Sequence, residues 1–141
     1  MARQILLILL ITLSIGLRAQ TSDIELVEFK SSECLSSEET PLKFDYEKKA
    51  DSLIVLKLKI YTNCCFNQDY GVRTSTDTLF LIYGSVYTID SVTNDREIDV
   101  CTCNCNFNFE YHIKNVSKDY NIVLRNEGFE NTSKIIGRIE L

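Results

Sequence analysis

The chain has 141 residues, of which 15 are basic and 20 are acidic, so its formal charge at pH 7 is −5. Nucleic acids and anionic membrane surfaces require a positively charged partner surface, and the acidic balance disfavours both. The length suits one domain with a hydrophobic core of its own.

The N-terminus has the features of a secretory signal peptide. Arg3 precedes an apolar run over residues 5–15, and Ala19 stands before the first polar stretch, so we expect residues 1–19 to be removed. The apolar run is shorter than the ~20 residues that cross a bilayer, and no spanning run follows it. We therefore expect residues 20–141 to form a single exported domain without a membrane span, located in the periplasm, at the cell surface or outside the cell.

After the signal peptide the sequence indicates a series of short strands. Residues 24–29 and 42–46 read as the first two, and 52–62 alternates clearly, with apolar residues on one face and Lys57 and Lys59 on the other. Residues 67–75 read as a loop. Further strands are expected at 77–83, which is apolar on both faces, and at 86–89, 101–113, 120–125 and 134–141.

These strands, with frequent turn signals and no helical period, predict an all-β fold. We expect an antiparallel β-sandwich of the immunoglobulin-like or transthyretin-like kind, with seven to eight strands and disulfide braces. The short connection after residue 114 predicts that 101–113 and 120–125 pair as a hairpin.

The stretch 101–113 has an unbroken period of two, which is typical of a strand with one buried and one wet face. Its odd positions, including Cys101, Cys103 and Cys105, join the aromatic residues on the predicted buried face. Its even positions form a polar face. These even residues are Thr102, Asn104, Asn106, Asn108, Glu110 and His112.

An even number of cysteines in an exported chain favours disulfides. The six are Cys34, Cys64, Cys65, Cys101, Cys103 and Cys105. Cysteines two apart on a strand have Cα atoms ~6.5 Å apart and rarely bond to each other, so each of the last three needs a partner among the first three, which leaves six connectivities. Cys64 continues the buried face of the 52–62 strand, so Cys103 is its favoured partner. Cys34 and Cys65 then take Cys101 and Cys105, in either order.

Two functions are compatible with these residues. In the first, the chain is a non-catalytic binding or structural module, and the polar face Asn104, Asn106, Asn108, Glu110 and His112 recognises a glycan or another exported protein through paired donors and acceptors. In the second, five thiolates bind a soft metal ion or exchange electrons. These are Cys64, Cys65, Cys101, Cys103 and Cys105.

The first function is favoured. The spacing lacks the ligand pairs typical of zinc sites and the Cys-x-x-Cys motif of thiol oxidoreductases. The single histidine stands near no Gly-x-Ser-x-Gly nucleophile motif. We therefore expect no catalytic residue, no cofactor and no bound metal.

Three motifs together resemble those of small exported proteins from Bacteroidetes-type bacteria. They are the Cys-x-Cys-x-Cys strand at 101–105, the Asn-Cys-Cys triplet at 63–65 and the Asp-Thr-Leu strand start at 77–79. The strand pair around 101–125 is also similar to the terminal hairpin of immunoglobulin-like and transthyretin-like sandwiches. The resemblance implies a β-sandwich and an exported location, and it supplies no activity.

Overall fold

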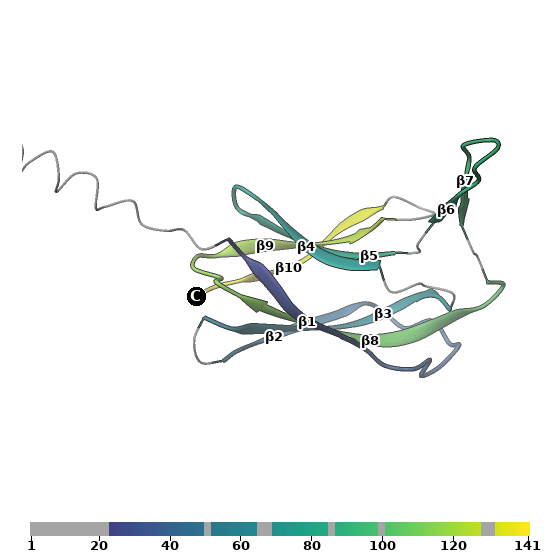
Figure 1. The fold of residues 1–141 in the computed structure, drawn as a ribbon. Helices are drawn as coiled ribbons and strands as arrows, with labels where there is room; N and C mark the ends of the chain where they lie inside the picture. The colour runs from purple at the N-terminus through teal and green to yellow at the C-terminus, as the bar shows by residue number, and fades with distance from the viewer. Residues whose placement is uncertain (1–22, 50–51, 65–68, 85–86, 99–100, 128–131) are drawn as a thin grey trace, which may run out of the picture.

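The computed structural model describes residues 23–49, 52–64, 69–84, 87–98, 101–127 and 132–141, which form ten strands (Figure 1). The expected signal peptide, residues 1–19, lies outside the described residues. The strands are β1 (Glu25–Ser31), β2 (Lys43–Lys48), β3 (Ile54–Asn63), β4 (Asp69–Ser75), β5 (Thr78–Gly84), β6 (Tyr87–Ile89), β7 (Arg96–Ile98), β8 (Asn104–Lys114), β9 (Tyr120–Asn126) and β10 (Ser133–Ile139).

Eight of these strands make a sandwich of two four-stranded sheets, which confirms the predicted all-β fold. Sheet A has the order β1-β8-β3-β2, and sheet B has the order β10-β9-β5-β4. Strands β6 and β7 pair as a separate hairpin that projects from one end of the sandwich (Figure 1). Sheet A is antiparallel throughout, whereas sheet B is mixed, because among the described strands β5 and β9 are the one parallel pair of an otherwise antiparallel sandwich.

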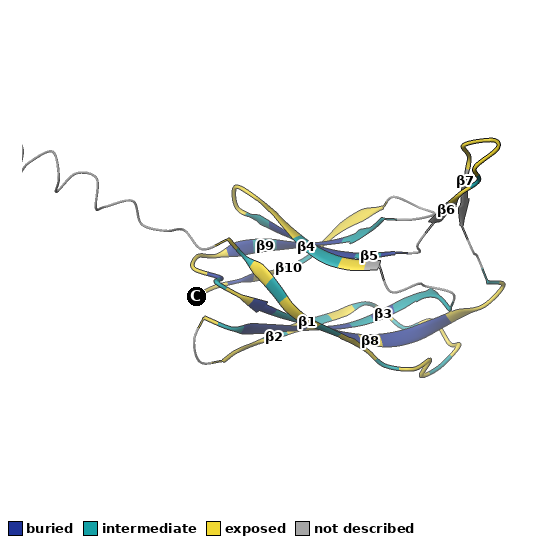
Figure 2. Ribbon diagram, viewed as in Figure 1, coloured by how far each residue is buried: buried dark blue, intermediate teal, exposed yellow. Residues whose placement is uncertain are grey.

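The core forms where the alternating faces of β3 and β8 meet sheet B. Leu56 lies opposite Tyr111 and Leu58 opposite Phe109 in the antiparallel register. The inward positions of both strands are buried, as Figure 2 shows by their dark blue segments, and they pack with apolar residues of β5 and β9. The period of two in each strand therefore places one full face in the core, as predicted.

A hydrogen bond joins the two sheets inside this core. The Tyr111 hydroxyl, on β8, donates to the carbonyl oxygen of Ile82, on β5, at 2.8 Å. Burial raises the pKa of Tyr111 far above its ordinary value, so the hydroxyl stays neutral and remains a donor. Because the donor and acceptor come from different sheets, this bond favours one relative position of the two layers.

Two predictions about the strands were wrong. Residues 67–75 read as a loop, yet 69–75 form β4, a polar edge strand that needs only one hydrogen-bonded neighbour, β5. The predicted hairpin of β8 with β9 is also absent, because β1 and β3 occupy both edges of β8. The chain instead crosses between sheets after β8, with Asn115 at φ 63° and Val116 buried in the core.

Gly84 ends β5 where the backbone of Glu127 passes over it, and Glu127 donates its N–H to the Tyr83 carbonyl at 2.9 Å. A β-carbon on Gly84 would overlap the Glu127 carbonyl oxygen and lie 2.7 Å from its carbonyl carbon. Backbone cannot rotate aside as a side chain can. We therefore expect Gly84→Ala to lower the free energy of unfolding by about 1–3 kcal/mol in urea titrations.

Gly71→Ala is the matched control, because Gly71 lies on the neighbouring strand β4 and pairs directly with Ile82. A β-carbon there would meet only the Ile82 Cδ1 atom, at 3.9 Å, which is ordinary van der Waals contact. Equal losses of stability in the two variants would show that crowding by Glu127 is not the cause.

Candidate functional site

The three clustered cysteines do not share one buried face. Strand β8 begins at Asn104, so Cys101 and Cys103 precede it, and of the three only Cys105 is fully buried. The Asn63 amide group, which belongs to β3, donates to the carbonyl oxygens of Cys101 at 2.7 Å and Cys103 at 3.1 Å. Its oxygen accepts the Cys101 N–H at 3.2 Å. These side-chain bonds take the place of the backbone hydrogen bonds of a regular strand, so the alternation of buried and exposed residues ends before Asn104. Cys103 is therefore exposed, contrary to the prediction.

One disulfide joins Cys34 to Cys105, with Cα atoms 5.6 Å apart. It is one of the three pairings that the six open connectivities allowed for Cys34, and it ties the segment before β2 to the start of β8. Cys101 is also disulfide-bonded. Cys65, its candidate partner from the sequence, lies outside the described residues. Because Cys101 and Cys105 are oxidised, the five-thiolate cluster considered above is not formed.

Cys64 and Cys103 are free thiols that lie side by side. The Cys64 N–H donates to the Cys103 carbonyl oxygen at 3.0 Å. The bridge predicted between them is not present in the structure. The Cys103 thiol, close enough to hydrogen-bond to the Cys64 sulfur, raises the pKa of Cys64 above its ordinary value. A raised pKa lowers the fraction of reactive thiolate at neutral pH.

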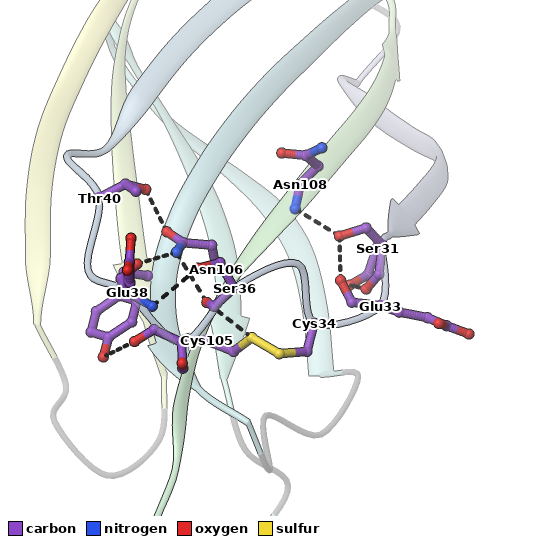
Figure 3. The surroundings of a disulfide bond; sticks show 12 residues. Ser31, Glu33, Cys34, Ser36, Glu38, Thr40, Cys105, Asn106 and Asn108 are labelled. Carbon is purple, nitrogen blue, oxygen red and sulfur yellow. Dashed lines mark hydrogen bonds between the residues drawn. A yellow bond between two sulfur atoms is a disulfide. The ribbon is translucent and has the colours of Figure 1, made fainter.

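Asn106 was predicted to lie on the wet face, and the structure buries it completely. It does point outward from sheet A, but the segment before β2 covers it (Figure 3). Its amide group donates to the carbonyls of Ser36, at 3.1 Å, and Glu38, while its oxygen accepts the Thr40 hydroxyl. Its own backbone N–H donates to Ser36 and its carbonyl accepts from Leu35. Asn106 therefore holds this segment on the sheet and is unavailable to a ligand.

Replacing Asn106 with alanine is expected to lower the free energy of unfolding by about 1–3 kcal/mol. The change removes the side-chain partner of the Glu38 carbonyl and of the Thr40 hydroxyl, while the Ser36 carbonyl loses one of its donors and keeps the backbone N–H of residue 106. Asn104→Ala, at an exposed position of the same strand, should change it by no more than about 0.5 kcal/mol. Denaturant titration of both variants tests this difference. Similar stabilities would show that the Asn106 side chain does not stabilise the segment that covers it.

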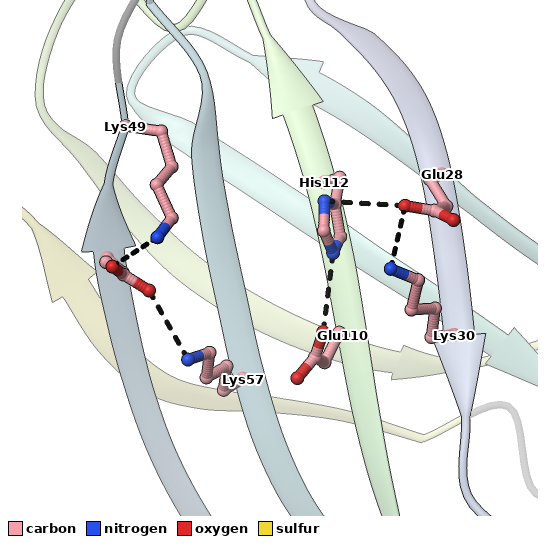
Figure 4. Close-up of polar contacts among 7 residues, drawn as sticks. Glu28, Lys30, Lys49, Lys57, Glu110 and His112 are labelled. Atoms are coloured by element: carbon pink, nitrogen blue, oxygen red, sulfur yellow. Dashed lines mark hydrogen bonds and ion pairs between the residues drawn. The ribbon is translucent and has the colours of Figure 1, made fainter.

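The rest of the predicted polar face divides into two parts. Asn104 and Asn108 are exposed, whereas Glu110 and His112 are half-buried and interact with each other. The His112 ring lies between two carboxylates, with Nε2 3.4 Å from Glu110 and Nδ1 3.6 Å from Glu28 (Figure 4). Lys30 pairs in turn with Glu28 at 3.1 Å. These are surface ion pairs of β1 and β8, each worth about 0–1 kcal/mol.

A groove of about 590 Å³ lies over β2, β3 and β8 of sheet A. The strand registers arrange its polar side chains in two rows, each running across three strands. Its polar lining residues are Lys43, Lys59 and Asn108 in one row, and Asp45, Lys57 and Glu110 in the next.

The sequence predicted Asn108 and Glu110 on a binding face but did not predict the other four polar residues of the groove. Lys57 and Lys59 were visible as the polar side of an alternating strand. The sequence does not show directly that β2 lies beside β3, which brings Lys43 and Asp45 to the same face. Both strands have alternating sequences, however, and pairing them with their polar faces on the same side would have predicted these residues.

Comparison with protein-family models, with curated proteins and with solved structures finds no match for this chain. In the part of the chain that the structure describes, no three His, Cys, Asp or Glu side chains are grouped as metal ligands. No helix among the same residues is long and apolar enough to cross a membrane.

Proposed function

We propose that this chain is an exported, non-catalytic binding module whose ligand occupies the groove on the outer face of sheet A. The groove itself carries the proposal, since it gathers side-chain donors and acceptors from three strands on one open surface. Hydrogen bonding between the strands fixes the spacing of these groups before a ligand arrives, which reduces the entropy lost on binding. The Cys34–Cys105 disulfide supports export, because such bonds persist in oxidising compartments.

The surroundings of His112 support binding over catalysis. Nucleophilic catalysis requires a histidine base beside a hydroxyl or thiol, with a third group that orients the base. His112 is the only histidine of the chain, and both its ring nitrogens face carboxylates of the β1–β8 surface. This geometry suits a structural ion-pair network.

A glycan array tests the proposed function, with the oxidised protein as the probe. We expect the wild-type protein to bind a subset of the arrayed glycans and Asn108→Ala to lose that binding, because Asn108 is an exposed amide of the groove. Asn104→Ala is the matched control, on the same strand outside the groove, and should bind normally. The proposal fails if the wild-type protein binds no glycan, or if the two variants bind equally.

The neighbouring thiols of Cys64 and Cys103 favour a second candidate, a thiol oxidoreductase. The two thiols would join as a disulfide, and their two electrons and two protons would reduce an external disulfide to two thiols. The raised pKa of Cys64 opposes this function, because the thiolate is the attacking form. Under the proposed binding function, the two thiols stay reduced and take no part in binding.

Intact mass and function of the exported protein separate these candidates. Two disulfides, that of Cys34 with Cys105 and that of Cys101, require a gain of about 4 Da on complete reduction, since each bond takes up two hydrogens. A Cys64→Ser/Cys103→Ser variant should gain the same mass on reduction and still bind its glycan. Rapid oxidation of the reduced wild-type protein by glutathione disulfide, combined with catalytic reduction of a second disulfide substrate by added reduced glutathione, would favour the oxidoreductase.

A further inference from the structure

Two lysines of the groove face each other across neighbouring strands. Lys43 on β2 is the direct register partner of Lys59 on β3. Like charges in directly opposed positions destabilise a sheet. Other lysines of this surface have nearby carboxylates, as Lys57 pairs with Glu47 at 3.4 Å. Among the described residues, neither Lys43 nor Lys59 has an ion-pair partner.

An anion placed between these two ammonium groups would remove their repulsion. Charge-assisted hydrogen bonds from both lysines to one carboxylate or sulfate are stronger than neutral ones. Asn108 is the next residue in the same row, so an amide group lies beside the cationic end. The complementary ligand group at this end is therefore negative.

The second row of the groove has the opposite character. Asp45 and Glu110 flank Lys57 in the register, and they lie two residues further along their strands, roughly 7 Å from the first row. Carboxylates accept hydrogen bonds from hydroxyl groups and repel further anions. A ligand that fits both rows carries a negative group at one end and hydroxyls at the other.

From this bipolar arrangement we infer that the groove binds an acidic saccharide, with its carboxylate or sulfate on Lys43 and Lys59 and its hydroxyls on Asn108 and Glu110. The inference rests on the proposed function and names the ligand class of the same groove. An acidic peptide fits less well. The groove lies over a sheet face, where the central strands β3 and β8 already use their backbone groups in ladders and leave only side chains to bind.

Calorimetric titration with a galacturonate oligosaccharide tests the inference. We expect the wild-type protein to bind it with an affinity that falls as salt rises, and Lys43→Gln/Lys59→Gln to lose about tenfold to a hundredfold. Lys114→Gln/Lys134→Gln is the matched control, because it changes the net charge equally at exposed positions outside the lining of this groove. The control should bind within about twofold of wild type.

Two further ligands separate the alternatives. Neutral maltohexaose bound as tightly as the galacturonate, with no effect of Lys43→Gln/Lys59→Gln, would overturn the acidic ligand and leave the proposed binding function intact. Polyglutamate bound more tightly than the galacturonate would replace the saccharide by an acidic peptide. An absence of binding by all three would overturn the inference, while the glycan array decides the proposed function separately.

Stability gives a readout that needs no ligand. Because Lys43→Gln removes one of the two facing charges, we expect this variant to unfold at a higher urea concentration than wild type at low salt. The difference should shrink as salt screens the repulsion. A lower urea midpoint for Lys43→Gln than for wild type would show that Lys43 and Lys59 do not repel each other in the folded protein.

Discussion

Replacing Phe109 with alanine is expected to lower the free energy of unfolding by about 3–5 kcal/mol. Phe109 is fully buried on the inward face of β8. Its ring lies 5.3 Å from the Phe29 ring and 5.9 Å from the Tyr83 ring, measured between centroids. Those neighbours come from β1 and β5, one in each sheet. The truncation therefore opens a cavity between two layers that cannot both close around it.

Urea unfolding followed by circular dichroism measures this loss. His112→Ala is the control on the outer face of the same strand. Loss of its contacts with Glu28 and Glu110 should lower the free energy of unfolding by at most about 1 kcal/mol. Equal losses in the two variants would mean that the inward face of β8 is not the centre of the core.

Removing the Cys34–Cys105 disulfide is expected to cost about 4 kcal/mol. The bond closes a loop with a sequence separation of 71 residues, and in the chain-entropy treatment a loop of this size stabilises the folded state by that amount. The effect arises from the freedom that the unfolded chain regains. The double variant Cys34→Ser/Cys105→Ser should therefore keep its sheets while it unfolds at a much lower urea concentration.

Glu33→Ser is the control for this variant, because Glu33 is the exposed neighbour of Cys34 in the same segment. It should alter stability by no more than about 0.5 kcal/mol. A loss below about 1 kcal/mol for the double serine variant would show that Asn106 and its hydrogen bonds hold the segment without help from the disulfide.

The alternating patterns of 52–62 and 101–113 predicted the two central strands of sheet A because burial on one face imposes a period of two. The same patterns could not predict strand pairing. Strand β4 has only two alternating apolar residues, Tyr70 and Val72, among polar ones and read as a loop. Strand β9 lies next to β5 and β10 because other strands already fill the edges of β8. Such choices depend on segments distant in sequence.

The polar face of β8 was predicted only in part for a similar reason. The period of two correctly placed Asn108 and Glu110 on the outer face, where they line the groove. It also placed Asn106 on that face, but Asn106 is buried because the disulfide-tethered segment folds over it. A sequence period determines which way a side chain points, whereas its exposure depends on what lies above it.

The cysteines show the same limit. Strand spacing excluded bonds between near neighbours and left Cys105 as one of three partners for Cys34, and the structure has this pairing. The prediction assumed that the strand continued through Cys101 and Cys103. The Asn63 side chain takes over the hydrogen bonding there, so the geometry of a regular strand does not apply.

The proposed binding surface of this module is the outer face of sheet A, across β2, β3 and β8. Amide chemical shifts of the ¹⁵N-labelled, oxidised protein, recorded during titration with a galacturonate oligosaccharide, test it most directly. We predict that the shifts that change will cluster at Lys43, Lys59 and Asn108. Changes clustered at Cys64 and Cys103, on the β6–β7 hairpin or evenly over both sheets would contradict this proposal.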